Sequence, residues 1–114
     1  MTEKQIQERV DFIREKLTKL GPGGGIVLAT YTRDEFSELR PGENYDDFKK
    51  AERQISERIA AEGFAAQIVF QEVDSVGFYR FIGKHGYSNS EQYRSLYAVL
   101  KNGEKQDEYK GETK

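Results

Sequence analysis

The sequence predicts a small α/β protein, and three observations support that prediction. An amphipathic helix precedes a Gly-rich break at residues 21–25, and a short apolar strand follows at residues 26–31. A second strand, at residues 64–73, comes after another amphipathic helix. Two strands separated by roughly thirty residues that contain a helix have the spacing of a βαβ crossover, so the strands should be parallel.

We expect the order α-β-α-β-α-α in one compact α/β domain over residues 1–103, with a small α+β arrangement as the variant of this class. Residues 104–114 contain one aromatic and no aliphatic side chain, which predicts a flexible polar tail. The sheet should be short and parallel, with two or three strands covered by helices. Two strands alone form a weak sheet, so the first helix covers the opposite face or a partner chain supplies a third strand.

The first helix has a clear start, a clear end and an apolar seam. Thr2 and Gln5 have the spacing of a capping box, and Gly21 followed by Pro22 predicts the end. The seam repeats every four and three residues, as in a heptad. Its members are Ile6, Val10, Ile13, Leu17 and Leu20. Two interpretations stay open: the helix packs within its own domain, or Ile6, Val10, Ile13 and Leu17 form a homodimer interface.

The middle of the chain predicts a central strand, an acidic loop and a second helix. The strand at 26–31 is apolar on both faces, as a buried strand would be. Residues 32–44 predict an acidic loop with about one helical turn. Asn44 is the expected cap of the second helix, and Asp46 and Asp47 suit the positive end of its dipole. Gly63 should end this helix.

The last part of the chain predicts two further helices. Asp74 or Ser75 should cap a short third helix over residues 76–82, which Gly83 and Gly86 then break. The fourth helix should start at a second capping-box spacing, Ser88 with Glu91, and end at residues 102–103. One face of it carries Tyr93, Leu96, Tyr97 and Leu100.

The composition excludes several classes of function. A formal net charge of -2 at pH 7 gives no whole-chain attraction to nucleic acid or to an anionic membrane. The chain has no Cys, which excludes a disulfide framework, a thiol nucleophile and Cys-based zinc sites. No apolar run is long enough to span a membrane, and the N-terminus lacks the apolar core of a signal peptide. We therefore expect a cytoplasmic protein.

We predict no cofactor and no metal. A Gly-rich loop that binds phosphate follows a strand and opens a helix, whereas here a helix precedes the glycines and a strand follows them. The carboxylates between residues 34 and 47 lack the alternate spacing of a calcium loop.

The leading functional prediction is a non-enzymatic interaction or regulatory module that binds a macromolecule, with a protein as the first candidate. Tyrosine and arginine dominate binding hot spots because each combines a large contact area with a polar tip. The third helix, the fourth helix and the loop between them are rich in both. The predicted partner-binding residues are Tyr79, Arg80, Lys84, His85, Tyr87 and Arg94. The alternative interpretation assigns the aromatic residues of this region to the core.

Two further classes stay open. The carboxyl ends of parallel strands are where ligands bind in open sheets, so a ligand-binding or enzymatic site is predicted from Thr32, Arg33, Glu72 and Asp74. His85 could serve such a site as a general base, but no nucleophile or orienting group accompanies it in the sequence, so we favour no enzyme. The third class is a nucleic-acid-binding accessory protein, because aromatic and basic residues also stack on single-stranded bases.

Overall fold

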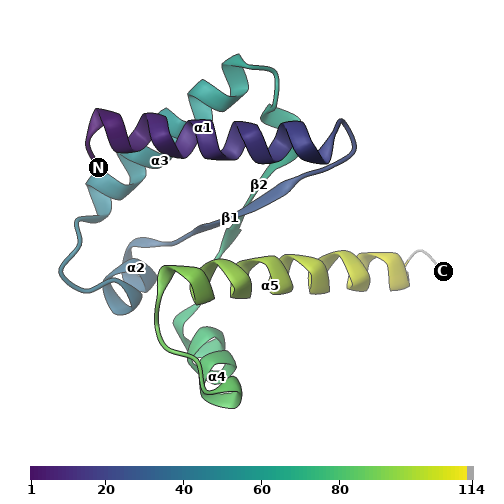
Figure 1. Ribbon diagram of the computed structural model, residues 1–114. Helices are drawn as coiled ribbons and strands as arrows, with labels where there is room; N and C mark the ends of the chain where they lie inside the picture. The colour runs from purple at the N-terminus through teal and green to yellow at the C-terminus, as the bar shows by residue number, and fades with distance from the viewer. Residues whose placement is uncertain (113–114) are drawn as a thin grey trace. The chain divides into compact units, whose positions relative to one another are not determined.

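The computed structural model describes residues 1–112, with side chains described up to Glu104 (Figure 1). Its elements are α1 (Glu3–Leu20), β1 (Ile26–Thr30), α2 (Arg33–Leu39), α3 (Tyr45–Ala61), the 3-10 helix η1 (Ala65–Gln67), β2 (Ile68–Glu72), α4 (Ser75–His85) and α5 (Glu91–Glu112). The strands β1 and β2 pair in a two-stranded parallel sheet. The predicted class and order are confirmed, with α2 as an additional element where a loop with one turn was expected.

The chain divides into two compact units. Unit 1 contains Met1–Ile26 and Gly42–Val69, and unit 2 contains Val27–Pro41 and Phe70–Lys114. Each strand therefore begins in unit 1 and ends in unit 2. Across the described residues, no helix combines the length and the apolar character that a membrane span requires.

In unit 1, α1 begins and ends where the sequence predicts. The Thr2 hydroxyl accepts from the backbone N–H of Gln5, and the Gln5 side chain accepts from the backbone N–H of Thr2. Gly21 closes the helix at a φ of 78°, a left-handed conformation that glycine adopts without strain. The capping box and the glycine stop are local signals, which is why the sequence alone located them.

The apolar seam of α1 is buried within the chain itself. Ile6, Val10, Ile13 and Leu17 are at most 5% exposed, and α1 packs against α3. The facing side of α3 buries Ala51, Ile55 and Ile59. The seam is therefore filled within unit 1, and the alternative prediction of a homodimer through these four residues is wrong.

One side chain shapes the Gly-rich break. The amide Nε2 of Gln67 donates to the carbonyl oxygens of Gly21 and Gly24, at 2.8 and 2.9 Å. A Cβ at Gly25 would lie 3.2 Å from the Gln67 carbonyl oxygen, so the backbones approach closely there. The break is thus a turn tied to η1. Because residues 65–67 form this 3-10 turn, β2 is shorter than the strand predicted over residues 64–73.

In unit 2, α2 replaces most of the loop predicted over residues 32–44. The Thr32 hydroxyl caps it by accepting from the backbone N–H of Glu35. Phe36 and Leu39, three residues apart, are both 1% exposed, and the Phe36 ring meets Tyr31 edge-on at 5.9 Å between centroids. Burial of this pair stabilises a seven-residue helix that would be marginal in isolation.

The boundaries of α4 and α5 differ from prediction at three glycine and serine positions. Gly83 lies inside α4, which ends instead at Gly86 in a left-handed conformation with a φ of 71°. Ser90 caps the next helix by accepting from the backbone N–H of Tyr93, so the predicted Ser88–Glu91 box is wrong. α5 continues through Gly103 to Glu112 instead of ending at residue 103. The flexibility predicted for residues 104–114 stays a prediction, and Thr113 and Lys114 lie outside the described residues.

Candidate functional site

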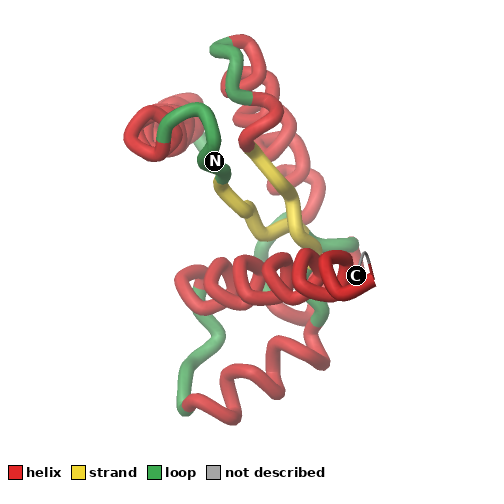
Figure 2. The backbone as a smooth tube through the Cα atoms, turned by 90° about the vertical axis from the view of Figure 1, so that its right-hand side faces the viewer, coloured by secondary structure: helices red, strands yellow, loops and turns green. Residues whose placement is uncertain are grey.

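The predicted partner-binding residues all lie in unit 2, on α4, on the loop over residues 86–90 and on the start of α5. Figure 2 shows α4 and α5 side by side, joined by that loop. Tyr79, Arg80, Lys84, His85 and Tyr87 have exposed side chains. Arg94, the sixth predicted residue, does not.

Arg94 is a buried structural residue. It is 7% exposed, its Nε donates to the Tyr31 hydroxyl at 3.1 Å, and one terminal nitrogen donates to Asn89 Oδ1 at 2.5 Å. The Asn89 amide in turn donates to the carbonyl of Leu39. Arg94 therefore holds α5 to the end of β1 and to the α4–α5 loop. Its inclusion among the partner-binding residues was wrong, because a charged residue becomes buried when it finds polar partners.

Tyr79 lies on a different side of α4 from Arg80. Its hydroxyl donates to Glu38 of α2 at 3.1 Å, and the residue is 41% exposed. Consecutive helical residues point about 100° apart. Arg80 follows Gly77 by three positions, and a Cβ at Gly77 would meet the Tyr97 hydroxyl of α5. Arg80 consequently lies on the α5 side of α4, whereas Tyr79 lies on the α2 side.

The α4–α5 loop is anchored by a stack of rings. Tyr87 stacks on Tyr93 with centroids 4.2 Å apart and planes 9° apart. It also stacks on His85, at 5.3 Å and 18°. Phe81 meets Tyr87 edge-on at 5.8 Å. The rings of Tyr87 and its neighbours are therefore packed against one another. Each of the two interpretations of the aromatic residues is partly correct, because the rings contact each other on one side while Tyr87 and His85 are exposed to solvent on another.

Two cations stand on α4 beside this ring cluster. Arg80 and Lys84 are four residues apart and exposed, so they share one side of the helix. Among the residues with described side chains, neither forms an ion pair. Arg80 is close enough to Tyr97 for its charge to act on that phenol, opposing the rise in pKa that burial and the hydrogen bond to Asp74 produce in Tyr97.

Two leucines of α5 complete the same side. Leu96 is 38% and Leu100 47% exposed, whereas Ala98 is fully buried. Leu100 lies three residues after Tyr97, the residue that contacts α4 through Phe78 and Phe81, and Leu96 lies one helical turn before Leu100. We call the following six residues the α4–α5 face: Arg80, Lys84, His85, Tyr87, Leu96 and Leu100.

The sequence predicted one apolar face with Leu96 and Leu100 beside Tyr93 and Tyr97, and it did not single out the two leucines as exposed. One signal could have corrected this. Apolar residues occur at every position from Leu96 to Leu100, so they surround the helix, and a helix at the edge of a small core cannot bury all of its sides. The structure buries the side that carries Ala98 and Arg94.

The predicted strand-end ligand site is organised around Asp74. One carboxylate oxygen accepts from the backbone N–H of Gly77 at 2.8 Å and caps α4, as predicted. The other accepts from the Tyr97 hydroxyl at 2.7 Å and from Lys101 Nζ. Burial by itself raises the pKa of Asp74, but the hydrogen bonds from Lys101, Tyr97 and Gly77 outweigh that effect and lower the pKa to about 2. Asp74 is thus an ionised residue held by α4 and α5.

The other predicted members of that site have different places. The Thr32 hydroxyl caps α2, and Arg33 and Glu72 are exposed. The carboxylate that reaches α4 is Glu35, which the sequence did not single out: its Oε2 accepts from the backbone N–H of Ser75 at 2.7 Å. A helix N-terminus attracts anions through its free N–H groups. At α4, two of these groups already bind carboxylates of the chain.

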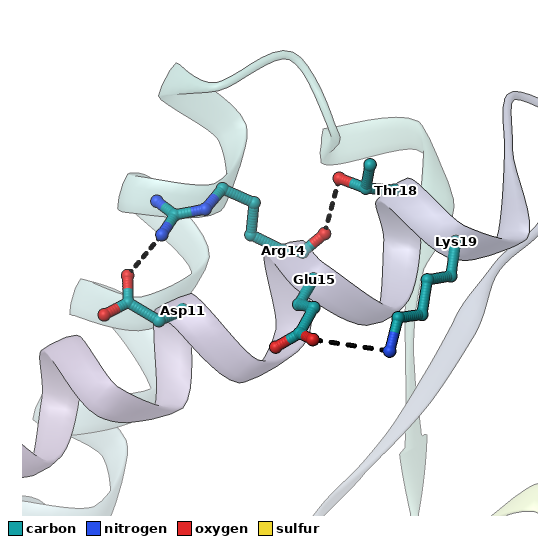
Figure 3. Close-up of a pocket in the computed structure, with 5 residues that line it drawn as sticks. All are labelled: Asp11, Arg14, Glu15, Thr18 and Lys19. Carbon is teal, nitrogen blue, oxygen red and sulfur yellow. Dashed lines mark hydrogen bonds and ion pairs between the residues drawn. The ribbon is translucent and has the colours of Figure 1, made fainter.

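Unit 1 has a shallow open pocket on α1, lined by Asp11, Arg14, Glu15, Thr18 and Lys19 (Figure 3). All of its lining residues come from one helix, and their charges are paired with each other or with Glu62, the residue after α3. Arg14 contacts Asp11 at 2.6 Å and Glu62 at 2.8 Å, and Lys19 contacts Glu15 at 3.3 Å. A surface whose charges are already paired offers little to an ionic ligand.

Comparison of the chain with protein-family models, with curated proteins and with solved structures finds no match. A functional conclusion has to come from the chemistry of the chain's own residues. Of the surfaces described above, the α4–α5 face combines cations that form no ion pair with a described side chain and exposed apolar area.

Proposed function

We propose that this protein is an interaction module that binds a protein partner through the α4–α5 face. One observation supports the proposal: Arg80 and Lys84 stand next to Leu96 and Leu100. The two cations form no ion pair with a described side chain, and the two leucines are 38% and 47% exposed. Interface hot spots are enriched in arginine and tyrosine, and a desolvated apolar centre with polar groups around it is their usual arrangement.

The residues that could carry chemistry favour binding over catalysis. Asp74 is held by three donors and caps a helix. A general base needs an orienting group and a reacting partner within hydrogen-bond distance. In the described part of the chain, the His85 imidazole contacts rings, at 5.1 Å from Phe81 and 5.3 Å from Tyr87, and hydrogen-bonds to no carboxylate. The ligand or enzyme alternative therefore receives no support from a specific contact.

The test is affinity capture from a lysate of the source cells, with and without nuclease, using three forms of the protein. The first is wild type. The second, Arg80→Glu with Leu100→Asp, changes the α4–α5 face. The third, Lys50→Glu with Arg53→Glu, is a control that alters two exposed cations of α3. Circular dichroism verifies that all three are folded.

We expect a stoichiometric protein partner that survives nuclease, binds wild type and the α3 control, and is lost from the face variant. Equal capture by all three forms would place binding elsewhere on the molecule. Capture that disappears with nuclease would replace a protein partner by a nucleic acid, and the absence of any partner would leave the interaction module without support.

A further inference from the structure

We infer that the segment of the partner that docks on the α4–α5 face is acidic and carries aliphatic side chains. This inference rests on the proposed function and specifies the chemistry of the partner. The juxtaposition behind it is a cationic pair on α4, Arg80 and Lys84, beside an aliphatic pair on α5, Leu96 and Leu100. A partner that satisfies both pairs must present carboxylates next to apolar groups.

The electrostatic argument starts from the local sign of the charge. The whole chain has a net charge of -2, yet the exposed side of α4 beside α5 presents Arg80 and Lys84. Asp74 is already matched by Lys101, and Glu38 accepts from Tyr79 on the other side of α4. Glu104 of α5 also acts on Tyr97, and the two cations of α4 outnumber this single carboxylate. Complementary charge across an interface increases the association rate and excludes partners of the wrong sign. The complement of this pair is a pair of carboxylates.

The apolar argument concerns α5. Leu96 and Leu100 lie one helical turn apart, on the same edge of the helix. Removal of apolar area from water stabilises a complex, so aliphatic side chains of the partner gain most by contacting these leucines. A purely ionic ligand would leave them in water.

The rings make nucleic acid a poorer occupant. Single-stranded bases bind by stacking on open aromatic faces along a cationic groove. Tyr93 covers one face of the Tyr87 ring, with centroids 4.2 Å apart and planes nearly parallel, so that face is not open to a base. His85 stacks on Tyr87 as well. Two cations also form a short track compared with the six to ten phosphate contacts that are typical of strong electrostatic binding.

The experiment is selection of a random-peptide library, displayed on phage, on immobilised full-length protein. Wild type is compared with Arg80→Glu/Lys84→Glu and with the α3 control Lys50→Glu/Arg53→Glu. Enriched peptides are synthesised, each with a matched version in which Asp and Glu become Asn and Gln, and their affinities are measured by calorimetry. A single-stranded oligothymidine serves as the nucleic-acid probe.

We expect enriched peptides that combine acidic and aliphatic residues. Their affinity should fall about tenfold or more with Arg80→Glu/Lys84→Glu, and similarly with the amide versions, because each change removes the charge complement. The α3 control should bind like wild type. Affinity should also decrease with added salt.

The other outcomes separate this inference from the proposed function. Basic or uncharged peptides that are lost with Leu96→Asp/Leu100→Asp would overturn the acidic partner and leave the face as a protein-binding site. Peptides that bind all variants equally would overturn both. Tight binding of oligothymidine that is lost with Arg80→Glu/Lys84→Glu would overturn both in favour of nucleic acid. An unenriched library would overturn the acidic segment, while the capture experiment decides the interaction module independently.

Discussion

Asp74 joins two helices of unit 2. Its carboxylate caps α4 through the N–H of Gly77 and holds α5 through Tyr97 and Lys101. Burial and the negative charge of Asp74 together raise the pKa of Tyr97, so the tyrosine stays a hydrogen-bond donor at neutral pH. At the residue scale, the strand-end carboxylate that suggested a ligand site acts as a structural link between two helices.

We predict that Asp74→Asn removes a pH-dependent part of the stability. A carboxylate with a lowered folded pKa contributes stability above its unfolded pKa, near 4, and this contribution disappears as pH falls toward about 2. Because the side chain is 39% exposed, solvent screening reduces the expected contribution to about 1 kcal/mol. Urea unfolding from neutral to acidic pH should show a loss in wild type that is smaller in the variant. The exposed Glu72→Gln change is the control, and identical pH profiles for wild type and Asp74→Asn would contradict the assignment.

At the scale of single elements, α4 contains two interior glycines with different surroundings. A Cβ at Gly77 would lie 2.1 Å from the Tyr97 hydroxyl and 2.5 Å from an Asp74 oxygen. A Cβ at Gly83 would have no neighbour within 4 Å. The close contact between α4 and α5 therefore requires glycine at position 77, whereas position 83 can accommodate a side chain.

We predict opposite effects of the same substitution at these two glycines. Gly77→Ala should destabilise the protein by about 2 kcal/mol, because the new methyl group displaces the Asp74–Tyr97 hydrogen bond and overpacks the contact. Gly83→Ala should stabilise it by about 0.5–1 kcal/mol through helix propensity. Chemical denaturation measures both. Since both positions belong to one helix, stabilisation by both alanines would show that Gly77 is not in contact with α5.

α1 allows a test of where its seam is buried. Leu17→Ala should cost about 2–5 kcal/mol, because a core leucine leaves a cavity. Leu20→Ala in the same helix should change stability by less than about 0.5 kcal/mol, because Leu20 is 52% exposed. Thermal unfolding at several protein concentrations measures the effect. If the midpoint temperature of unfolding increased with protein concentration in wild type but not in Leu17→Ala, the homodimer interpretation would be restored.

At the scale of the whole molecule, the charge balance predicts weak binding to nucleic acid. With a net charge of -2 and an isoelectric point near 5.5, the protein as a whole should repel a polyanion, although cations such as Arg80 and Lys84 attract it locally. Fluorescence anisotropy with labelled oligothymidine at low salt should give a dissociation constant above about 10 μM. A tight complex that weakens steeply with salt would show that the local cations outweigh the overall charge.

The local signals of the chain predicted most of the elements. Capping by Thr2, Asn44 and Asp74 was predicted because a cap depends on residues within one turn. The interior glycines misled, because a glycine inside a helix costs only about 1 kcal/mol and packing or neighbouring residues outweigh it. Gly83 and Gly103 were thus predicted as helix ends but lie inside α4 and α5.

The sequence predicted which residue types form the candidate site more accurately than it predicted which of these residues are exposed. Arg80, Lys84, His85 and Tyr87 are exposed as expected, whereas Arg94 is buried, the reverse of prediction, and the exposed Leu96 was not singled out. Exposure depends on partners distant in sequence, here Tyr31 for the Arg94 guanidinium. Hydrophobicity alone cannot identify such partners.

The sequence by itself determined the α/β class, the order of elements, the parallel pair of strands and the caps, because these depend on periodicity and on neighbours within a few positions. Only the tertiary structure decided which side of α5 is buried, that Gln67 holds the Gly-rich turn, and that Asp74 links α4 to α5. The physical reason is that burial and hydrogen bonding are properties of a residue's spatial neighbours. In unit 2 those neighbours are 23 positions apart for Asp74 and Tyr97 and 63 for Tyr31 and Arg94.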